Sequence, residues 1–147
     1  MMLAERPVGL AAAATEPRSR KAPEQPTPGQ GRAPRRVLVV DDERDLADLT
    51  EALLGAYGLE VKVAYCAADA LLILESDPAI DAVFSDVTMP GMTGLQLAEA
   101  IGHLYPSLKV VLTTGFACRA LLTSHGRPYP CASKPYRIET VLELLRS

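Results

Sequence analysis

Residues that commonly build metal centres and covalent cross-links are scarce in this chain of 147 residues, which has three cysteines and two histidines. Cys66, Cys118 and Cys131 form no CxxC pair, and an odd number of cysteines does not indicate a disulfide framework. We therefore expect them to be small apolar packing residues. His103 and His125 are isolated from residues that would complete a zinc site or a catalytic triad. The sequence argues against both kinds of site.

Long hydrophobic runs are also missing. The longest apolar stretch near the amino terminus, 8–14, is far shorter than the roughly 18–20 residues that a membrane-spanning helix needs. A signal peptide is not expected either, because Glu5 lies where such a peptide has its basic region and the alanine run is weakly hydrophobic. The predicted location is therefore the cytoplasm.

Basic residues are few in the main part of the chain. Residues 1–36 hold seven Lys/Arg against three Asp/Glu, whereas 37–147 hold eight against fifteen, so the two parts carry +4 and −7 within a total of −3. Surfaces that bind nucleic acids are rich in Lys and Arg because they contact phosphates. The acidic main part argues against a nucleic-acid partner.

The first 35 residues contain half of the twelve prolines and show no apolar period. Such a segment cannot bury enough surface to offset the entropy that it would lose on ordering. We expect residues 1–35 to be a disordered Pro/Ala/Arg-rich arm and 36–147 to form one domain, which is an ordinary size for a single core. The composition of the arm assigns it no function.

From residue 36 onward, short apolar runs alternate with stretches of helical periodicity. The run 37–40 is typical of a strand buried on both faces, and the helical segment that follows ends at Gly58, as a helix C-terminus often does. The same patterns predict further strands at 61–64, 82–85, 110–113 and 129–133, and helices at 46–57, 67–74, 95–103, 116–122 and 138–145. Five strand–helix units with short connections predict a doubly wound α/β sandwich around a parallel sheet.

Polar residues follow the predicted strands at their carboxyl ends. Asp41 and Asp42 follow the first strand, Asp86 the third, Thr114 the fourth and Lys134 the fifth. Ligands of open parallel sheets bind at this edge. Three carboxylates brought this close would raise one another's pKa unless a cation lay between them. Because Mg²⁺ prefers oxygen ligands and binds through one or two carboxylates, the sequence predicts a Mg²⁺ site.

The same edge is suited to phosphoryl transfer. Asp86 is the best placed nucleophile, because aspartate forms aspartyl-phosphate intermediates. Lys134 and Thr114 would supply a positive charge and a hydroxyl that neutralise the charge developing on the phosphoryl group. These three residues come from three different strand ends, which is the arrangement that such a site needs.

Helix N-capping is an alternative explanation for the acid pair. Asp42 or Glu43 would lie at the start of the first helix, where negative charge is favourable. Capping accounts for Asp41 and Asp42 about as well as a metal site does. It does not account for Asp86 and Lys134, which follow later strands.

Four short segments occur in order within 36–147: VLVVDDE, FSDVTMPGMTG, VVLTTG and SKPY. Together they resemble the receiver domain of the response regulators of two-component signalling, both stand-alone receivers and receivers of hybrid histidine kinases. Each segment is weak evidence by itself, but all four fall in register. The resemblance implies a (βα)5 flavodoxin-like sandwich with a central five-stranded parallel sheet.

The resemblance also implies a set of metal ligands. Asp42 and Asp86 would bind Mg²⁺ directly, Asp41 would bind through water, and the main-chain carbonyl of Thr88 would complete the ligands that the protein provides. Asp86 would be the phosphorylation site.

The remaining site residues take their implied roles from the same likeness. Thr114 would bind the phosphoryl group, Lys134 would pair with it, and the Lys134–Pro135 peptide bond would be cis. Thr88 and Phe116 would border the path of attacking water. Phe116 would either shield the acyl phosphate or only pack against the neighbouring helix.

The implied function is that of a phosphorelay phosphoacceptor and not of an enzyme. A histidine kinase or histidine phosphotransfer protein would donate the phosphoryl group, and signalling would go through protein contacts, because the chain ends one helix after Lys134. Relay, phosphate sink and gated binder remain open. A phosphohydrolase of the haloacid-dehalogenase type would need a second acid where Thr88 stands, and an interaction module with a vestigial site is the third alternative.

Overall fold

The computed structural model of the chain describes residues 33–115 and 129–147. The predicted arm lies outside these ranges apart from its last three residues, and the predicted helix 116–122 lies wholly outside them. The described elements, in chain order, are β1 (Arg36–Val40), α1 (Arg44–Ala56), β2 (Glu60–Ala64), α2 (Ala67–Ser76), β3 (Ala82–Asp86), α3 (Gly94–Leu104), β4 (Lys109–Thr114), β5 (Cys131–Ser133) and α5 (Ile138–Arg146).

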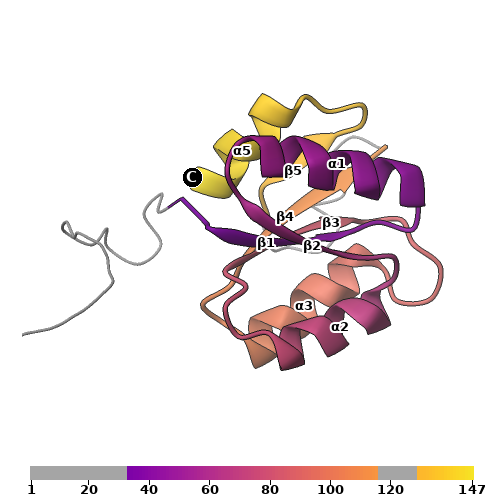
Figure 1. The fold of residues 1–147 in the computed structure, drawn as a ribbon. Helices are drawn as coiled ribbons and strands as arrows, with labels where there is room; N and C mark the ends of the chain where they lie inside the picture. Colours follow the sequence, from indigo (N-terminus) through magenta and orange to yellow (C-terminus); the bar gives the residue numbers. More distant parts are fainter. Residues whose placement is uncertain (1–32, 116–128) are drawn as a thin grey trace, which may run out of the picture. The chain divides into compact units, whose positions relative to one another are not determined.

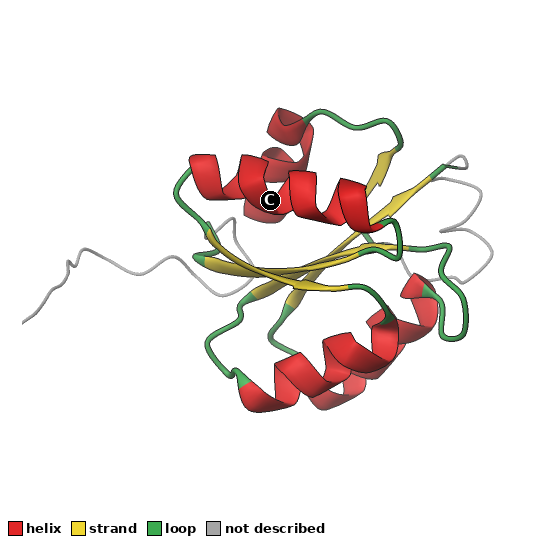
Figure 2. Ribbon diagram, turned by 45° about the vertical axis from the view of Figure 1, so that its right-hand side comes forward, coloured by secondary structure: helices red, strands yellow, loops and turns green. Residues whose placement is uncertain are grey.

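The five strands form one parallel sheet in the order β2-β1-β3-β4-β5. Helices α1 and α5 cover one face of the sheet, and α2 and α3 cover the other (Figure 1; Figure 2). Because parallel strands need a crossover between them, α1, α2 and α3 each return the chain to the edge of the sheet where the next strand begins. The doubly wound sandwich with a five-stranded parallel sheet is confirmed.

Two hydrophobic clusters hold the helices on the sheet. Side chains alternate between the two faces of a strand. Val37 and Val39 therefore join the cluster that includes residues of α1 and α5, whereas Leu38 and Val40 join the cluster that includes residues of α2 and α3. All four side chains are at most 2% exposed, which explains why β1 is an unbroken apolar run.

Some boundaries differ from the predicted ones. β3 and β4 each extend one residue further at the carboxyl end, to Asp86 and Thr114. β5 begins at Cys131, so Tyr129 and Pro130 lie before it rather than within it. Proline has no N–H for the ladder, although the Pro130 carbonyl still accepts a bond from the N–H of the neighbouring strand. The predicted end of the first helix is confirmed, with the following glycine at φ 93°.

Charged side chains link the segments at the amino end of the sheet. The carboxylate of Asp81 accepts the backbone N–H groups of Arg35 and Arg36 at 3.0–3.2 Å. The Arg36 guanidinium lies 2.9 Å from carboxylate oxygens of Glu60 and Asp77. The start of β1 is thereby fastened to the start of β2 and to the segment that precedes β3.

The described cysteines match the expected packing role only in part. Cys66 is free and is the N-cap of α2, where its sulfur accepts the N–H of Asp69 at 3.4 Å. Cys131 packs against the core, as expected, but it is also disulfide-bonded, contrary to expectation. Cys118 lies outside the described residues. Sequence analysis missed the capping role of Cys66, because serine, threonine, aspartate or asparagine more often occupies the N-cap position.

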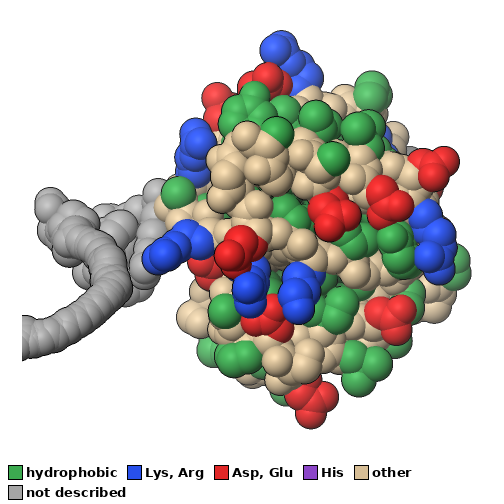
Figure 3. Space-filling view, in the orientation of Figure 1, with side chains coloured by type: hydrophobic (Ala, Val, Ile, Leu, Met, Phe, Trp, Pro, Cys, Tyr) green, Lys and Arg blue, Asp and Glu red, His purple; other side chains and the backbone are tan. Residues whose placement is uncertain are grey.

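The surface of the described domain mixes charges of both signs. Figure 3 shows Lys and Arg side chains interspersed with Asp, Glu and hydrophobic side chains over the visible face. Among the helices in the described ranges, none combines the length and the apolar character that crossing a membrane requires.

Candidate functional site

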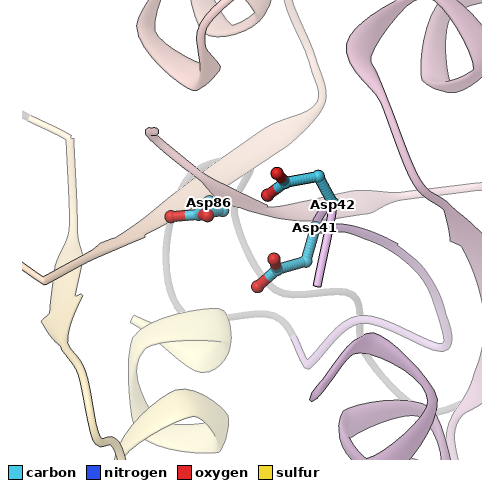
Figure 4. A group of neighbouring side chains, drawn as sticks. All are labelled: Asp41, Asp42 and Asp86. Atoms are coloured by element: carbon cyan, nitrogen blue, oxygen red, sulfur yellow. The ribbon is translucent and has the colours of Figure 1, made fainter. Parts of the chain in front are cut away.

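Three aspartates meet at the carboxyl edge of the sheet. Asp41 and Asp42 follow β1, and Asp86 is the last residue of the adjacent strand β3. One carboxylate oxygen from each lies within 4.8 Å of the other two. Figure 4 shows the three groups gathered beside the strand ends. The structure therefore brings together the carboxylates that the sequence placed at this edge.

Strand alternation explains the direction of the buried acids. Asp41 lies two residues beyond Val39, and Asp86 two residues beyond Phe84, and both of these apolar residues belong to the cluster below α1 and α5. The acids continue the same inward-facing rows and are only 2% and 4% exposed, respectively. Asp42 is the next residue after Asp41, and it is exposed. Asp86 is thus held by β3, whereas Asp41 and Asp42 lie in the connection from β1 to α1.

The main chain of Asp86 is fixed by the start of α3. A Cβ atom added to Gly94 would lie 2.1 Å from the Asp86 carbonyl oxygen and 2.8 Å from the Val87 Cα atom. The Gly94 N–H also donates to the Val87 carbonyl at 2.9 Å. Only glycine permits this approach, so the last glycine of the D-x-x-M-P-G-M-x-G loop has a packing role beside the acid.

Lys134 lies over the acids. Its ammonium nitrogen is 3.3 Å from carboxylate oxygens of both Asp41 and Asp86, and 2.9 Å from Glu43. Its backbone N–H donates to the Thr114 carbonyl at 2.8 Å, which docks the segment after β5 on the end of β4. The Lys134–Pro135 peptide bond is cis, as the resemblance implied.

Burial dominates the electrostatics of the cluster. It raises the pKa of Asp41 and of Asp86 above the ordinary 3.8, and the charge of Asp41 raises the pKa of Asp86 further. Lys134 opposes both shifts. Burial alone would lower the pKa of Lys134, but the carboxylates of Glu43, Asp41 and Asp86 outweigh it and raise that pKa. One ammonium thus balances only part of the negative charge.

Thr114 and Thr88 complete the predicted residues at this edge. Thr114 ends β4 and is fully buried. Thr88 is exposed, and its backbone N–H lies 3.4 Å from a carboxylate oxygen of Asp86. The predicted role of Phe116 concerns a residue outside the described ranges.

The capping alternative is correct for the position of Glu43 but not for a side-chain bond. Glu43 occupies the N-cap position, yet no side-chain bond caps the helix. The Glu43 carboxylate reaches Lys134 instead. Asp41 accepts the Glu43 N–H at 2.9 Å through its own carboxylate. Sequence reasoning missed the pairing of Glu43 with Lys134, because an acid at this position satisfies the capping pattern equally well.

The three carboxylates fit a hard divalent cation. Their oxygens are mutually close enough to share one ion, and a second positive charge would relieve the burial of two acids that Lys134 only partly compensates. Mg²⁺ prefers oxygen ligands of this kind. The cluster is typical of a Mg²⁺ site.

Comparison with known proteins identifies the family. The response regulator receiver domain matches residues 37–125, and the chain belongs to this family. Members are signalling phosphoacceptors rather than enzymes in the usual sense, and a histidine kinase is the phosphodonor that membership implies. This chain is accordingly a phosphoacceptor receiver of a two-component phosphorelay.

Individual relatives agree with the family assignment. The sensor histidine kinase RcsC of Salmonella typhimurium is 36% identical over 114 residues, or 74% of this chain and 12% of RcsC. The chemotaxis protein CheY4 of Vibrio cholerae has a TM-score of 0.68 at 27% identity, over 77% of this chain and 97% of CheY4. TrrA of Thermotoga maritima, solved in complex with Mg(2+)-BeF, has a TM-score of 0.63 at 32% identity, over 75% of this chain and 98% of TrrA.

The chain is short beside its curated relatives. It spans 24% of the length of the NtrX-like response regulator of Rickettsia bellii and of DctD of Rhizobium meliloti, and 12% of RcsC. The comparisons therefore bear on the receiver domain and not on the activities of those longer proteins.

Proposed function

We propose that Asp86 is the residue that accepts the phosphoryl group. A carboxylate oxygen of Asp86 forms a bond to phosphorus while the bond between phosphorus and the donor atom breaks, which leaves an aspartyl phosphate and the free donor. Asp86 is favoured over Asp41 because it ends the central strand β3 and has the N–H of Thr88 beside it. Asp41 has one oxygen occupied by the Glu43 N–H.

Lys134 and Thr114 neutralise the charge that the transfer places on the phosphoryl oxygens. The Lys134 ammonium already lies 3.3 Å from Asp86, so it needs only a small movement to contact a group bound there. Thr114 comes from the adjacent strand end and supplies a hydroxyl. Neither residue forms a covalent bond in this scheme.

Asp41, Asp42 and Asp86 would hold the Mg²⁺ ion, and the carbonyl of Thr88 would add a main-chain oxygen. When bound, the ion would neutralise negative charge on both the carboxylates and the phosphoryl oxygens. The proximity of the three carboxylate oxygens supports this ligand set. The raised pKa of the two buried acids supports it as well, since a cation would stabilise their charged forms.

The partners follow from the chemistry of transfer. The donor would be a phosphohistidine of a kinase or of a phosphotransfer protein, and the phosphorylated domain would act on a downstream protein through its surface. The acidic main part of the chain favours a protein partner over nucleic acid. A cytoplasmic location suits both partners.

The observation that carries this proposal is the ion pair of Lys134 with both buried acids at one strand edge. The test is incubation with acetyl phosphate and Mg²⁺, followed by intact-mass measurement. We expect one phosphoryl group per chain in the wild type and none in Asp86→Asn. Asp45→Asn, on the first turn of α1, is the matched control and should be labelled normally.

Three results would contradict the assignment. Labelling of the Asp86→Asn protein at another residue would show that the acceptor lies elsewhere. Continuous release of phosphate from phosphomonoesters would show a hydrolase, and absence of labelling in a folded wild type that binds Mg²⁺ would show a vestigial site.

A further inference from the structure

Tyr136 connects the three segments that carry the site. Its hydroxyl lies 2.7 Å from the Thr50 hydroxyl on α1. Its ring meets the ring of Phe84 edge to face, with centroids 5.2 Å apart and planes at 86°. Tyr136 follows Lys134 by two residues, and Phe84 precedes Asp86 by two. One half-buried ring thus joins β3, α1 and the segment that carries the lysine.

The direction of the hydroxyl bond can be assigned. The Thr50 hydroxyl donates its single proton to the Leu46 carbonyl at 2.8 Å. Tyr136 is therefore the donor in the bond between the two hydroxyls. Burial raises the pKa of Tyr136, and the charges of Asp41 and Asp86 raise it further, so the phenol keeps the proton that it donates.

Water cannot replace the bond between the Tyr136 and Thr50 hydroxyls. Thr50 is 1% exposed, so its hydroxyl oxygen depends on protein partners. The two hydroxyls come from residues 86 positions apart, and each is held by its own element. A bond between two such fixed points limits how far the segment after β5 can move relative to α1.

The neighbours of Tyr136 do not provide a similar anchor. Pro135 and Arg137 are exposed on either side of it. The backbone N–H of Lys134 donates to the Thr114 carbonyl. The long side chain of Lys134 must still extend from the segment 134–136 to the acids, so its reach depends on where that segment lies. The position of the ammonium therefore depends on both ends of the short segment 134–136.

We propose that Tyr136 is a positioning residue: its hydroxyl bond to Thr50 and its contact with Phe84 hold the segment 134–136 so that the Lys134 ammonium stays over the acid cluster. The inference rests on the proposed function for its kinetic consequence, but not for its structural one. Loss of the hydroxyl bond alone should slow phosphorylation, because the ammonium would no longer be held where the phosphoryl group arrives.

Two single substitutions remove the bond from opposite ends. Tyr136→Phe keeps the ring on Phe84, and Thr50→Val keeps the volume of the threonine. We expect each to lower the phosphorylation rate at saturating acetyl phosphate by about three- to tenfold, the range that one hydrogen bond accounts for. The double variant should be no slower than the slower single variant, because both remove the same bond.

Two further variants serve as controls. Thr50→Ser keeps the hydroxyl and should keep the wild-type rate. Tyr57→Phe removes an exposed phenol that lies 3.4 Å from a carboxylate oxygen of Glu139, and it should leave the rate unchanged. Mg²⁺ affinity should be the same in all of these proteins, because the three carboxylates are untouched.

A second readout does not need phosphorylation. The chain has four lysines, and NMR of ¹⁵N-labelled lysine side chains reports an ammonium group held in ion pairs. We expect the Lys134 ammonium signal to broaden or shift in Tyr136→Phe and in Thr50→Val, but not in Thr50→Ser. The Lys62 signal, whose ion pair with Asp77 lies elsewhere, should stay unchanged.

The outcomes separate the two proposals. If the wild type is not phosphorylated, the proposed function fails while the NMR comparison still decides the role of Tyr136. If Tyr136→Phe and Thr50→Val lower the melting temperature but leave both the rate and the Lys134 signal at wild-type values, the hydroxyl bond is only structural and the positioning role is wrong.

Discussion

Asp86 and Thr113 are direct cross-strand neighbours at the ends of β3 and β4, yet only the aspartate has polar partners for its side chain. The Thr113 hydroxyl is buried and has no hydrogen-bond partner among the described residues. Thr50, equally buried at 1% exposure, has two partners for its hydroxyl. The two threonines therefore form a matched pair for measuring the cost of an unpaired buried hydroxyl.

We predict that Thr113→Val stabilises the domain by about 1 kcal/mol, because an apolar group of the same shape removes a polar group that the fold leaves unpaired. Thr50→Val should destabilise it by about 1–2 kcal/mol, because it removes two bonds and leaves the half-buried Tyr136 hydroxyl without the oxygen that accepts its proton. Chemical denaturation of both variants gives the sign of each change in the free energy of unfolding directly. Because the two expected changes have opposite signs, an error shared by both measurements is easy to detect.

The acid cluster predicts a dependence of stability on pH. The pKa values of Asp41 and Asp86 are raised above 3.8 in the folded domain. A raised pKa means that the folded state holds the proton more tightly, so this stability is complete below pH 3.8 and is lost as the pH rises through the raised value. In metal-free protein, Asp86→Asn should therefore gain stability relative to the wild type as the pH rises from acid to neutral.

Thermal melting in chelator at a series of pH values tests this expectation. The difference in melting temperature between Asp86→Asn and the wild type should grow with pH and shrink when Mg²⁺ is added. A difference that is constant with pH would mean that the carboxylate is not the source of the instability.

Gly94 is predicted to tolerate no side chain. A methyl group would meet the Asp86 carbonyl oxygen at 2.1 Å, so Gly94→Ala must displace either α3 or the acceptor strand. We expect a loss of about 1–3 kcal/mol, as for overpacked cores. Gly55→Ala is the control, because a Cβ atom at Gly55 meets nothing within 4 Å. Gly55 lies in the last turn of α1, so this change should stabilise by at most roughly 0.5–1 kcal/mol.

Lys134→Ala should separate metal binding from phosphoryl transfer. The lysine is not a metal ligand, and its removal takes a positive charge away from the acids, so Mg²⁺ should bind at least as tightly as in the wild type. Phosphorylation by acetyl phosphate should slow by about a hundredfold or more, as when a preorganised donor is removed from a charge-stabilising site. Lys62→Ala, which removes a half-exposed lysine paired with Asp77, should change neither quantity.

Calorimetric titration with Mg²⁺ and measurement of the labelling rate supply the two quantities. Loss of Mg²⁺ binding in Lys134→Ala would show that the lysine organises the carboxylates rather than the phosphoryl group.

The site residues that could be predicted from the sequence are those that follow the ends of strands. Asp41 and Asp86 each follow a recognisable apolar run, and Lys134 follows a weaker one that Pro130 interrupts. Parallel topology alone brings such positions to one edge. Their meeting needed no knowledge of side-chain packing. The same reasoning identified the fold, because buried parallel strands read as unbroken apolar runs.

The contacts that sequence reasoning missed depend on packing between distant segments. The bond between Tyr136 and Thr50 joins residues 86 positions apart and has no local pattern. Glu43 satisfied a capping pattern although its side chain pairs with Lys134. The start of β5 was misplaced because Pro130 carries a carbonyl that still bonds to the sheet without an N–H to continue it.

The two ends of β1 respond to ionic strength in opposite directions. At the amino end, Arg36 attracts Glu60 and Asp77, and dissolved ions weaken that attraction. At the carboxyl end, the carboxylates of Asp41, Asp42 and Asp86 outnumber the one Lys134 ammonium, so a net repulsion remains, and the same ions relieve it. We therefore expect the melting temperature of the metal-free domain to change little with added sodium chloride. A melting temperature that does not change with salt would mean that two opposite effects cancel at the ends of one five-residue strand. In Asp86→Asn the repulsion is weaker, so the melting temperature should fall as salt is added.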